Sequence, residues 1–299
     1  MKILVTGASG FIGASLVPFL TTGGHTVTRL VRREAEAGRG ELRWDPEAGA
    51  IDAKGLGGHD AAVHLAGESV AAGRWTQKRK ARILESRTRS TRLLAETLAG
   101  LAMKPKALIC ASAIGFYGSR GDEVLREGSP PGKGFLAEVT RAWEAAAGAA
   151  EQAGIRVVPL RLGIVLGPGG GALAKMLPAF RMGLAGRLGD GKQYMSWIAI
   201  DDVVGAIQHV LGSDDLSGPV NVTAPEPVTN GEFTKTLARV LSRPAVLPLP
   251  ALALRIALGE MADEMLLAST RVVPARLLDR GFRFRYPALE GCLRHVLGR

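Results

Sequence analysis

The fold is decided near the start of the chain by the stretch Lys2-Ile-Leu-Val-Thr-Gly-Ala-Ser-Gly-Phe-Ile-Gly13. Residues 2–6 are an apolar run bounded by glycine, which is typical of a buried strand. Residues 11–22 have a helical pattern that ends at Gly23-Gly24. The glycines between them suit a sharp turn, a close approach of backbone amides to a diphosphate, and tight packing of helix on strand. The predicted ligand contacts in this turn are Gly7, Ser9, Gly10, Phe11 and Ile12.

The rest of the first half alternates between strand and helix patterns. Predicted strands are 26–31, 61–65, 107–111 and 157–160, and predicted helices are 76–101 and 136–153. Pro159 is unusual in a central strand. Such alternation indicates parallel βαβ units with helices on both faces. We therefore expect an α/β fold, a doubly wound parallel sheet of Rossmann type. The pattern becomes irregular after the glycine-rich stretch 167–171, so we expect a nucleotide-binding domain at 1–166 and a smaller substrate region at 167–299, part of which returns to the sheet.

The end of the second predicted strand indicates which dinucleotide is bound. Sites for NAD place an acidic residue there to hold the ribose 2′-hydroxyl, whereas this chain has Arg32 and Arg33. A guanidinium matches the geometry and charge of a phosphate. The sequence therefore predicts NADP(H), whose 2′-phosphate needs a counter-charge. The alternative is that both arginines are ordinary surface residues of a basic protein.

The amino-acid composition argues against several other classes of protein. The 299 residues include 46% hydrophobic and 22% charged residues, which is an ordinary globular balance, and 39 glycines, about twice the usual share. Two cysteines are too few for a disulfide framework, and no spacing indicates a metal site. The net charge of +10 is dispersed along the chain, so we expect an anionic small molecule rather than nucleic acid as the partner. No apolar run is long enough to cross a membrane, and we expect a cytoplasmic protein.

Several motifs resemble the extended short-chain dehydrogenase/reductase superfamily. They are the turn at 6–13, the segment His64-Leu65-Ala66-Gly67, and Ser112 followed by Tyr117-Gly118. Further segments resemble one branch of it, the "epimerase family" of nucleoside-diphosphate-sugar epimerases with a C-terminal domain of unknown function, here about 245–299. These segments are Trp75, Ser86-Arg87, 112–118, 135–138, 196–198, Asp201-Asp202, Gly259-Glu260, 271–274, Gly281-Phe282 and Tyr286-Pro287. The resemblance implies the Rossmann fold across the whole chain.

The catalytic pair of that superfamily is missing. Its members use a tyrosine followed four residues later by a lysine, because a phenol with a pKa near 10 needs a neighbouring cation to act at neutral pH. No Tyr-x-x-x-Lys occurs in this chain, and the matching positions hold Leu136 and Thr140. Ser112 remains as a candidate to bind a substrate carbonyl, although a one-residue shift would put Ala113 there. Tyr117 is a candidate for the lost acid; the alternative is that it packs in a turn.

Other residues are candidates for the cofactor cleft. Leu65, Ala66 and Gly67 follow a strand, and ligands bind beyond the carboxyl ends of such strands. Arg161 also lies at a strand end. Arg82 and Arg87 lie on the long helix beside the cleft and either reach a cofactor phosphate or ribose or form a solvated basic face.

Two functions remain open at this stage. The first is an NADP(H)-dependent oxidoreductase or epimerase acting on a small substrate, in keeping with the resemblance. The second is an NADP(H)-binding sensor or scaffold, in keeping with the missing Tyr–Lys pair. The resemblance also implies a homodimer through helices 76–101 and 136–153.

Overall fold

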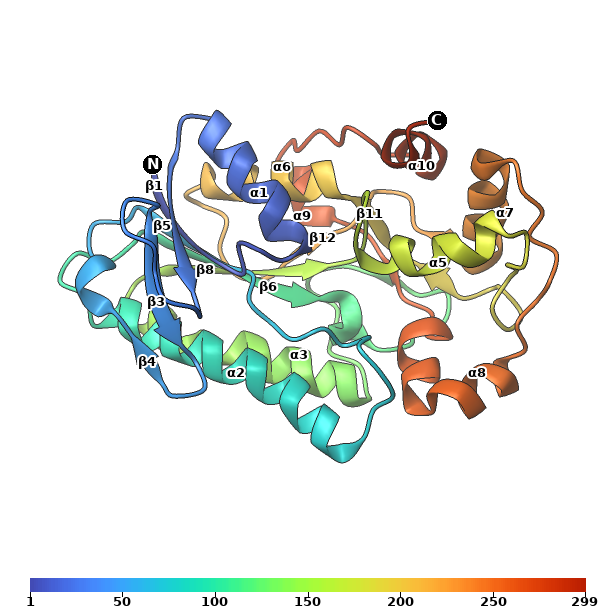
Figure 1. Ribbon diagram of the computed structural model, residues 1–299, viewed down its shortest axis with the longest axis horizontal. Helices are drawn as coiled ribbons and strands as arrows, with labels where there is room; N and C mark the ends of the chain where they lie inside the picture. The colour runs from blue at the N-terminus through green and yellow to red at the C-terminus, as the bar shows by residue number, and fades with distance from the viewer.

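A computed structural model describes all 299 residues of the chain. Its centre is an eight-stranded sheet with the order β12-β8-β6-β5-β1-β2-β3-β4 (Figure 1). All neighbouring strands are parallel except the β3–β4 pair. The strands are β1 (Lys2–Thr6), β2 (Thr26–Val31), β3 (Glu41–Asp45), β4 (Ala50–Ile51), β5 (Ala61–His64), β6 (Ala107–Ala113), β8 (Arg156–Leu162) and β12 (Val220–Val222). The predicted doubly wound α/β sheet is confirmed.

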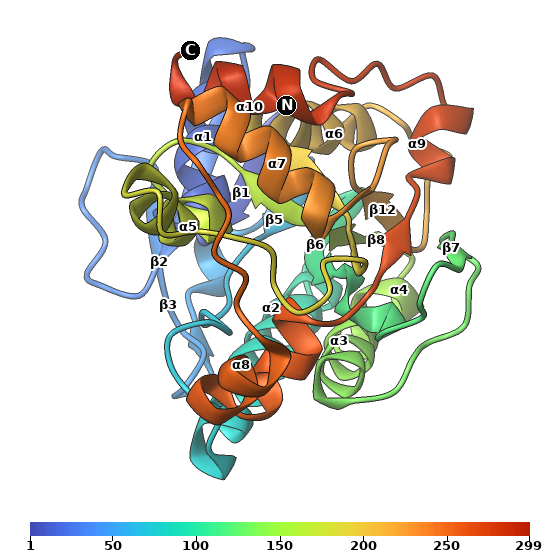
Figure 2. The same cartoon turned by 90° about the vertical axis from the view of Figure 1, so that its right-hand side faces the viewer.

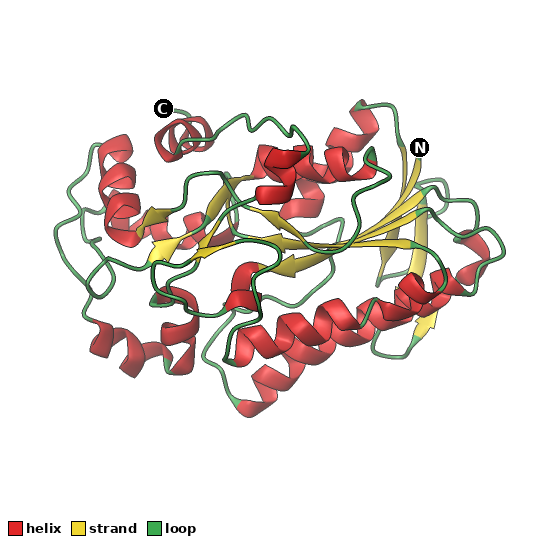
Figure 3. Cartoon of the chain, turned by 180° about the vertical axis from the view of Figure 1, so that it is seen from behind, coloured by secondary structure: helices red, strands yellow, loops and turns green.

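Helices cover both faces of this sheet (Figure 3). One face packs against α1 (Phe11–Thr22) and α6 (Ile200–Leu211), through a core that includes Leu16, Leu20, Val203 and Ile207. The other face packs against α2 (Gln77–Ala99), α3 (Phe135–Ala145) and α4 (Gly148–Gln152). Strands between two helical layers are buried on both sides, which explains why they are nearly continuous apolar runs.

Two local features differ from the sequence expectation. The helix predicted at 136–153 is two helices, α3 and α4, because the chain breaks regular helix around Ala146–Ala147 before Gly148. Pro159 does lie in β8, but β12 pairs with β8 only from Leu160 to Leu162. At Pro159 the strand therefore has one neighbour, which resembles the edge position that proline tolerates.

The second half of the chain forms a smaller unit at one end of the sheet (Figure 1). Its core joins α5 (Gly171–Arg181), α7 (Asn230–Leu241) and α10 (Leu289–Leu297). It also contains α8 (Ala251–Leu258), α9 (Ala275–Asp279) and the π-helical turn Ala262–Leu266. The short strands β7 (Val124–Leu125), β9 (Ile164–Leu166), β10 (Tyr194–Met195), β11 (Trp197–Ala199), β13 (Val228–Thr229) and β14 (Arg271–Val272) form three two-stranded pairs, and 3₁₀ turns lie at Ala53–Gly55 and Ile114–Tyr117. No helix is long and apolar enough to cross a bilayer.

Candidate functional site

The predicted contacts gather where three neighbouring strands end together. In the sheet register Thr6 lies beside both Leu30 and His64. The residues that follow these three positions are the glycine turn, the two arginines after β2, and Leu65-Ala66-Gly67. The carboxyl ends of parallel strands are the usual ligand crevice of such sheets.

The glycines of the turn are required by close backbone packing. A Cβ atom on Gly13 would lie 2.2 Å from the carbonyl oxygen of Gly7, and one on Gly7 would lie 2.7–2.9 Å from the backbone of Leu65 and Ala66. Gly7 also has a φ of +68°, which favours glycine. No side chain other than hydrogen fits at these positions, so the turn brings bare backbone to the ends of β1 and β5.

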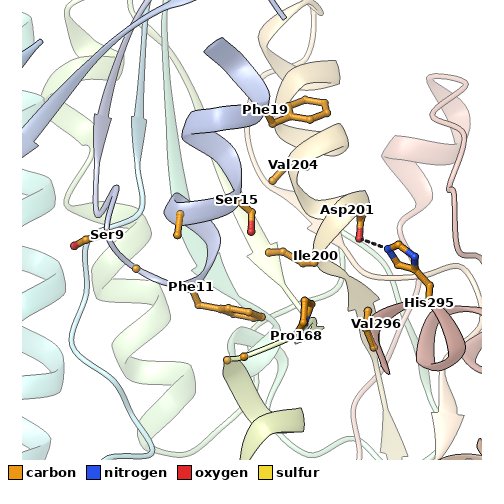
Figure 4. Close-up of a pocket in the computed structure, with 14 residues that line it drawn as sticks. Ser9, Phe11, Ser15, Phe19, Pro168, Ile200, Asp201, Val204, His295 and Val296 are labelled. Carbon is orange, nitrogen blue, oxygen red and sulfur yellow. Dashed lines mark hydrogen bonds and ion pairs between the residues drawn. The ribbon is translucent and has the colours of Figure 1, made fainter. Parts of the chain in front are cut away.

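The first turn of α1 offers free hydrogen-bond donors. The helix begins after Gly10, which provides no side-chain cap, and its first turn contains no acidic residue. The backbone N–H groups of Phe11, Ile12 and Gly13 have no acceptor in the protein. Unpaired amides at the positive end of a helix dipole form a site for an anion such as a diphosphate. Ser9 lies in the same turn, with its side chain directed away from α1 (Figure 4).

Arg32 and Arg33 have different environments, although they are adjacent in sequence. Arg33 donates to the carboxylate of Glu41 at 2.7 Å, and Arg29 approaches the same oxygen at 2.8 Å. The side chain of Glu41 is buried, and a hydrogen bond from the backbone N–H of Glu36, followed by the Arg33 contact, holds the pKa of Glu41 below its usual range. Arg32 is exposed and makes no ion pair or side-chain hydrogen bond. Of these two arginines, only Arg32 has a guanidinium without a protein anion.

A buried hydrogen-bond chain fixes the end of β5. The imidazole Nδ1 of His64 lies 2.7 Å from Thr6 Oγ1, and Nε2 lies 3.3 Å from Ser90 Oγ. Thr6 Oγ1 in turn accepts from the backbone N–H groups of Leu65 and Ala66. Burial lowers the pKa of His64 to about 4, so the ring is neutral at physiological pH. His64 therefore positions the strand end through both of its ring nitrogens.

Arg87 lies against the loop that follows β5. Its guanidinium carbon is 3.6 Å from the position that a Cβ on Gly67 would occupy, and it stacks over Trp143 at 4.9 Å. One nitrogen donates to the carbonyl of Ile83, but no carboxylate forms an ion pair with it. Burial lowers the pKa of Arg87 to about 10. A largely buried cation without a counter-ion is costly, which makes Arg87 a strong candidate for contact with an anionic ligand.

Arg82 is less available than Arg87. It pairs with Glu68 at 2.8 Å, and Glu68 also binds Arg79. The side chain of Arg82 is 61% exposed, so its ion pair is weakened by solvent. This geometry favours a surface role for Arg82.

Ser112, Tyr117 and Arg161 belong to one buried polar network outside the crevice. Arg161 donates to both oxygens of Glu144 at 2.9 Å, and its third nitrogen donates to the hydroxyl of Tyr117 at 3.0 Å. The hydroxyl of Ser112 donates to Glu144 at 2.6 Å. The guanidinium of Arg161 also stacks on the ring of Phe116 at 3.4 Å. These contacts explain why a charged residue can lie inside the protein at the end of β8.

This network gives both predicted catalytic side chains hydrogen-bond partners within the protein. Tyr117 is fully buried, and its hydroxyl donates to Asn221 Oδ1 at 2.6 Å. Burial raises the pKa of Tyr117, so its phenol is a weaker acid than usual. Ser112 is 2% exposed, and its single proton is committed to Glu144. In this structure the hydroxyls of both residues and the guanidinium of Arg161 have protein partners, and the catalytic and cofactor roles of the three residues stay predictions.

The positions of the missing Tyr–Lys pair have no replacement acid or cation. Leu136 lies in the first turn of α3 and packs near Gly115, and Thr140 donates back to the carbonyl of Leu136. The carboxylate of Glu264, from the C-terminal region, accepts from the backbone N–H groups of Phe135 and Leu136 at 2.6 and 2.7 Å. A residue 129 positions away therefore caps the helix that would carry the catalytic tyrosine.

A cavity of about 700 Å³ adjoins the outer side of the glycine turn (Figure 4). It lies between α1, α6, α10 and the loop 168–170. The ring of Phe11 points towards Pro168, and a Cβ on Gly170 would lie 2.3 Å from that ring. At the far end Asp201 pairs with His295 at 3.2 Å. The backbone N–H of Phe11 thus belongs to the glycine turn, whereas its ring packs against the loop 167–171.

Sequence reasoning missed the carboxylates that organise the site. Glu41, Glu144 and Glu264 each bind partners that lie elsewhere in the chain. Glu144 is in an alanine-rich helix, where a lone acid is consistent with solvent exposure, and nothing local indicates its partner Arg161. Only Glu41 left a signal in the sequence, since two of the arginines in and just after the adjacent strand, Arg29 and Arg33, are its partners.

Comparisons with known proteins agree with this architecture. Residues 3–223 match the NAD dependent epimerase/dehydratase family, and residues 249–296 match the Domain of unknown function DUF1731. An epimerase family protein of Mycobacterium bovis is 43% identical over 297 residues, covering 99% of this chain and 98% of that protein. A Bacillus subtilis epimerase family protein is 38% identical over 301 residues, covering 99% and 98% respectively. The crystal structure of human epimerase family protein SDR39U1 (isoform 2) with NADPH superimposes with a TM-score of 0.91 at 35% identity, covering 100% of both chains.

Proposed function

Because the chain belongs to the NAD dependent epimerase/dehydratase family, we propose that it binds NADP(H) in the crevice beyond β1, β2 and β5. The observation that carries this proposal is the set of unpaired donors at that crevice. The amides of Phe11, Ile12 and Gly13 have no protein acceptor, and Arg32 has no protein anion. The human relative with a TM-score of 0.91 was solved with NADPH, which supports the same ligand for this chain.

The residues present suit each part of the cofactor. The α1 amides and the bare backbone at Gly7 and Gly10 would hold the diphosphate. Arg32 would bind the 2′-phosphate with a charge-assisted hydrogen bond, and Arg33 would support it indirectly by holding the loop through Glu41. Arg87, which has no counter-ion of its own, would contact an anionic or hydroxyl group of the cofactor near Gly67.

The geometry supports binding more strongly than it supports the superfamily's usual chemistry. A nicotinamide cofactor supplies a hydride, and that step requires a partner that gives or takes a proton at the substrate oxygen. The hydroxyls of Ser112 and Tyr117 are committed to Glu144 and Asn221, and Leu136 cannot exchange a proton. We therefore propose an NADP(H)-binding protein that does not use these residues for catalysis.

An oxidoreductase or epimerase acting on a small substrate is the second candidate. Its specific support is the C-terminal region, which reaches back to the first turn of α3 through Glu264 and so lies beside the place where the superfamily's reaction occurs. If this candidate is correct, the proton donor is a group other than Ser112, Tyr117 and Leu136. Consumption of NADPH with a panel of carbonyl compounds, unchanged in a Tyr117→Phe variant, would support it.

Titration of the purified protein with NADPH and NADH, followed by nicotinamide fluorescence, tests cofactor binding. Loss of one charge-assisted contact costs about 1.5–3 kcal/mol, so Arg32→Ala should weaken NADPH binding about 10- to 100-fold and leave NADH binding unchanged. Arg39→Ala is the matched control, because Arg39 is an exposed arginine in the adjacent loop that pairs with Glu36. If neither dinucleotide binds, the proposal fails; if Arg32→Ala and the control behave alike, the assignment of the 2′-phosphate fails.

A further inference from the structure

An apolar surface is exposed at the end of the molecule that faces the viewer in Figure 2, where the chain runs down from α7 to α8. Its six most exposed large side chains are Met182, Leu184, Val246, Leu247, Leu252 and Ile256, which are between 48% and 75% exposed. Each exposes on the order of 100 Å², so together they expose about 600 Å², the upper end of the range for the largest apolar patch on a monomer. We call this set the α8 surface.

The middle of the α8 surface is unusually poor in polar groups. Residues 244–254 contain no polar side chain. The N–H groups of Leu247 and Leu249 donate to carbonyls of the neighbouring segment 185–187, and the prolines that follow each of them have no N–H. An exposed edge of this kind usually presents a row of unpaired N–H groups, whereas residues 247–250 present none. This stretch therefore loses little by moving from water into an apolar environment.

Basic side chains border the α8 surface. The two segments that form it, 181–192 and 243–256, contain five exposed basic residues and one exposed acidic residue. These are Arg181, Arg187, Lys192, Arg243 and Arg255, and Asp190. Of the five, only Arg255 pairs with a carboxylate, that of Asp263 at 2.9 Å. Apolar side chains bordered by an excess of Lys and Arg are typical of surfaces that bind anionic lipid.

Three arginines converge on a pocket at one end of the α8 surface. The pocket has a volume of about 260 Å³ and is lined by Arg181, Leu241, Arg243, Leu297 and Arg299. It adjoins the apolar side chains, because Met182 directly follows Arg181 and a Cβ on Gly183 would lie 3.3 Å from the ring of Pro244. The helices α5, α7 and α10 end here, and each C-terminus offsets about half a positive charge. Since no carboxylate side chain lines the pocket, positive charge remains to hold a phosphate group.

We propose that the α8 surface docks the protein on a membrane that contains anionic phospholipid. Leu252 and Ile256, one helical turn apart on α8, would enter the boundary between head groups and acyl chains together with Val246 and Leu247. The bordering arginines would remain at the level of the phosphates, and the arginine pocket would hold one of them. Such docking keeps the protein on the bilayer surface and needs no helix that spans it. The proposal does not depend on the identity of the cofactor or on turnover.

The same features disfavour a protein as the occupant of this surface. In a symmetric contact between two copies of the chain each patch meets itself, so the five basic side chains of one copy would oppose those of the other, and like charges across an interface hinder association. A contact with a different protein normally includes about ten direct hydrogen bonds. The stretch 244–254 has no side chain that could make one.

Co-sedimentation of the full-length protein with two kinds of vesicle tests the proposal: phosphatidylcholine alone, and phosphatidylcholine mixed with phosphatidylserine. We expect clear binding to the mixed vesicles and little to the neutral ones. Arg181→Ala/Arg243→Ala should weaken binding about 25-fold, since each basic residue near an anionic surface contributes a factor of about five. Arg92→Ala/Arg141→Ala is the matched control, because it removes two exposed arginines from α2 and α3, outside the α8 surface, and it should bind like the wild type.

A second pair of variants tests the apolar part of the surface. Leu252→Glu/Ile256→Glu should weaken binding to the mixed vesicles at least about 100-fold, because two side chains no longer enter the bilayer and two negative charges face the lipid. Met103→Glu should bind like the wild type, because Met103 is 65% exposed but lies outside the α8 surface. Unfolding curves for each variant check that these exposed substitutions leave the fold intact.

Several results would overturn the proposal. A wild type that binds neither kind of vesicle has no such lipid contact. Equal weakening of binding by both arginine pairs would show that the net charge of the protein, rather than the α8 surface, attracts the vesicles. If the wild type ignores vesicles but forms a dimer that Leu252→Glu/Ile256→Glu dissociates, the surface is covered by a second copy. If it ignores vesicles but binds polyglutamate through Arg181 and Arg243, the partner is an acidic protein.

Discussion

The buried histidine at the end of β5 makes the stability of the protein depend on pH. His64 is fully buried and held by Thr6 and Ser90. Its short contact with Thr6 is satisfied when the threonine hydroxyl donates to a neutral ring nitrogen, which leaves Nε2–H to donate to Ser90. A second ring proton would face the same hydroxyl oxygen that already accepts the amides of Leu65 and Ala66. Acid should therefore destabilise the folded state at this position.

The size and sign of the effect follow from the two pKa values. Burial lowers the pKa of His64 from 6.5 to about 4 in the folded protein. The unfolded chain thus takes up the proton first, and stability that is complete above pH 6.5 is lost as the pH falls towards 4. At 1.36 kcal/mol per pH unit the loss amounts to ~3 kcal/mol. Most of it falls above pH 4.5, before the carboxylates with lowered pKa values, such as Glu41 and Glu232, begin to contribute.

Urea unfolding at pH 7.5, above the histidine window, and down to about pH 4.5, near its lower end, measures most of this loss. We expect the free energy of unfolding of the wild type to fall by ~1.4 kcal/mol per pH unit below pH 6.5 from this group. His64→Gln should start lower at neutral pH but lack that slope, and His59→Gln, which removes a partly buried histidine bonded to the Leu56 carbonyl, should keep it. Parallel pH profiles for the wild type and His64→Gln would refute the reasoning, because they would show that His64 titrates alike in the folded and unfolded chains.

Three further substitutions test the site. Tyr117→Phe should lower the free energy of unfolding by about 1–3 kcal/mol, because it leaves a buried Arg161 N–H without its acceptor. It should leave NADPH affinity unchanged. Weaker NADPH binding at unaltered stability would show instead that this hydroxyl contacts the cofactor. Glu264→Ala should cost about 1 kcal/mol in thermal or urea unfolding by uncapping α3, and an unchanged midpoint would count against the cap. Gly13→Ala should cost at least about 2 kcal/mol and abolish NADPH binding, because its Cβ would overlap the Gly7 carbonyl; a stable variant that binds NADPH normally would contradict the packing argument.

Most strands of the sheet were predictable because the patterns that indicate them lie within short stretches of sequence. The strands 2–6 and 26–31 and the helix 11–22 appear in the structure with those same limits, since apolar runs and glycine breaks are properties of neighbouring residues. The strands β3 and β4 at one side of the sheet and the short strands of the second half were not predicted. Their pairing depends on distant segments, as when β7 pairs with β14 across 147 positions in the register of Val124 with Arg271.

The position of the cofactor crevice was predictable because it also depends on neighbouring residues. The hydrogen-bond and ion-pair partners of the side chains around it were not predictable. The turn at 7–13 requires glycine because of its own backbone geometry. By contrast, Arg32 and Arg33 look equivalent in the sequence, and only the buried Glu41 eight residues beyond Arg33 separates them. Both arginines lie in the bend that follows β2, and the next strand of the sheet supplies a partner for Arg33 alone.

The buried network gives Ser112 and Tyr117 a structural role that does not depend on catalysis. Glu144 and Arg161 form a bidentate pair inside the protein, and such a pair is stable only when its remaining donors and acceptors are satisfied. Ser112 and Tyr117 satisfy them, by donating to Glu144 and accepting from Arg161. Their hydroxyls are thus required by the charge pair itself, whether or not a reaction takes place. Retention of Ser112 and Tyr117 is therefore no argument for turnover, and a search for a proton donor should begin with groups that face the crevice rather than with this pair.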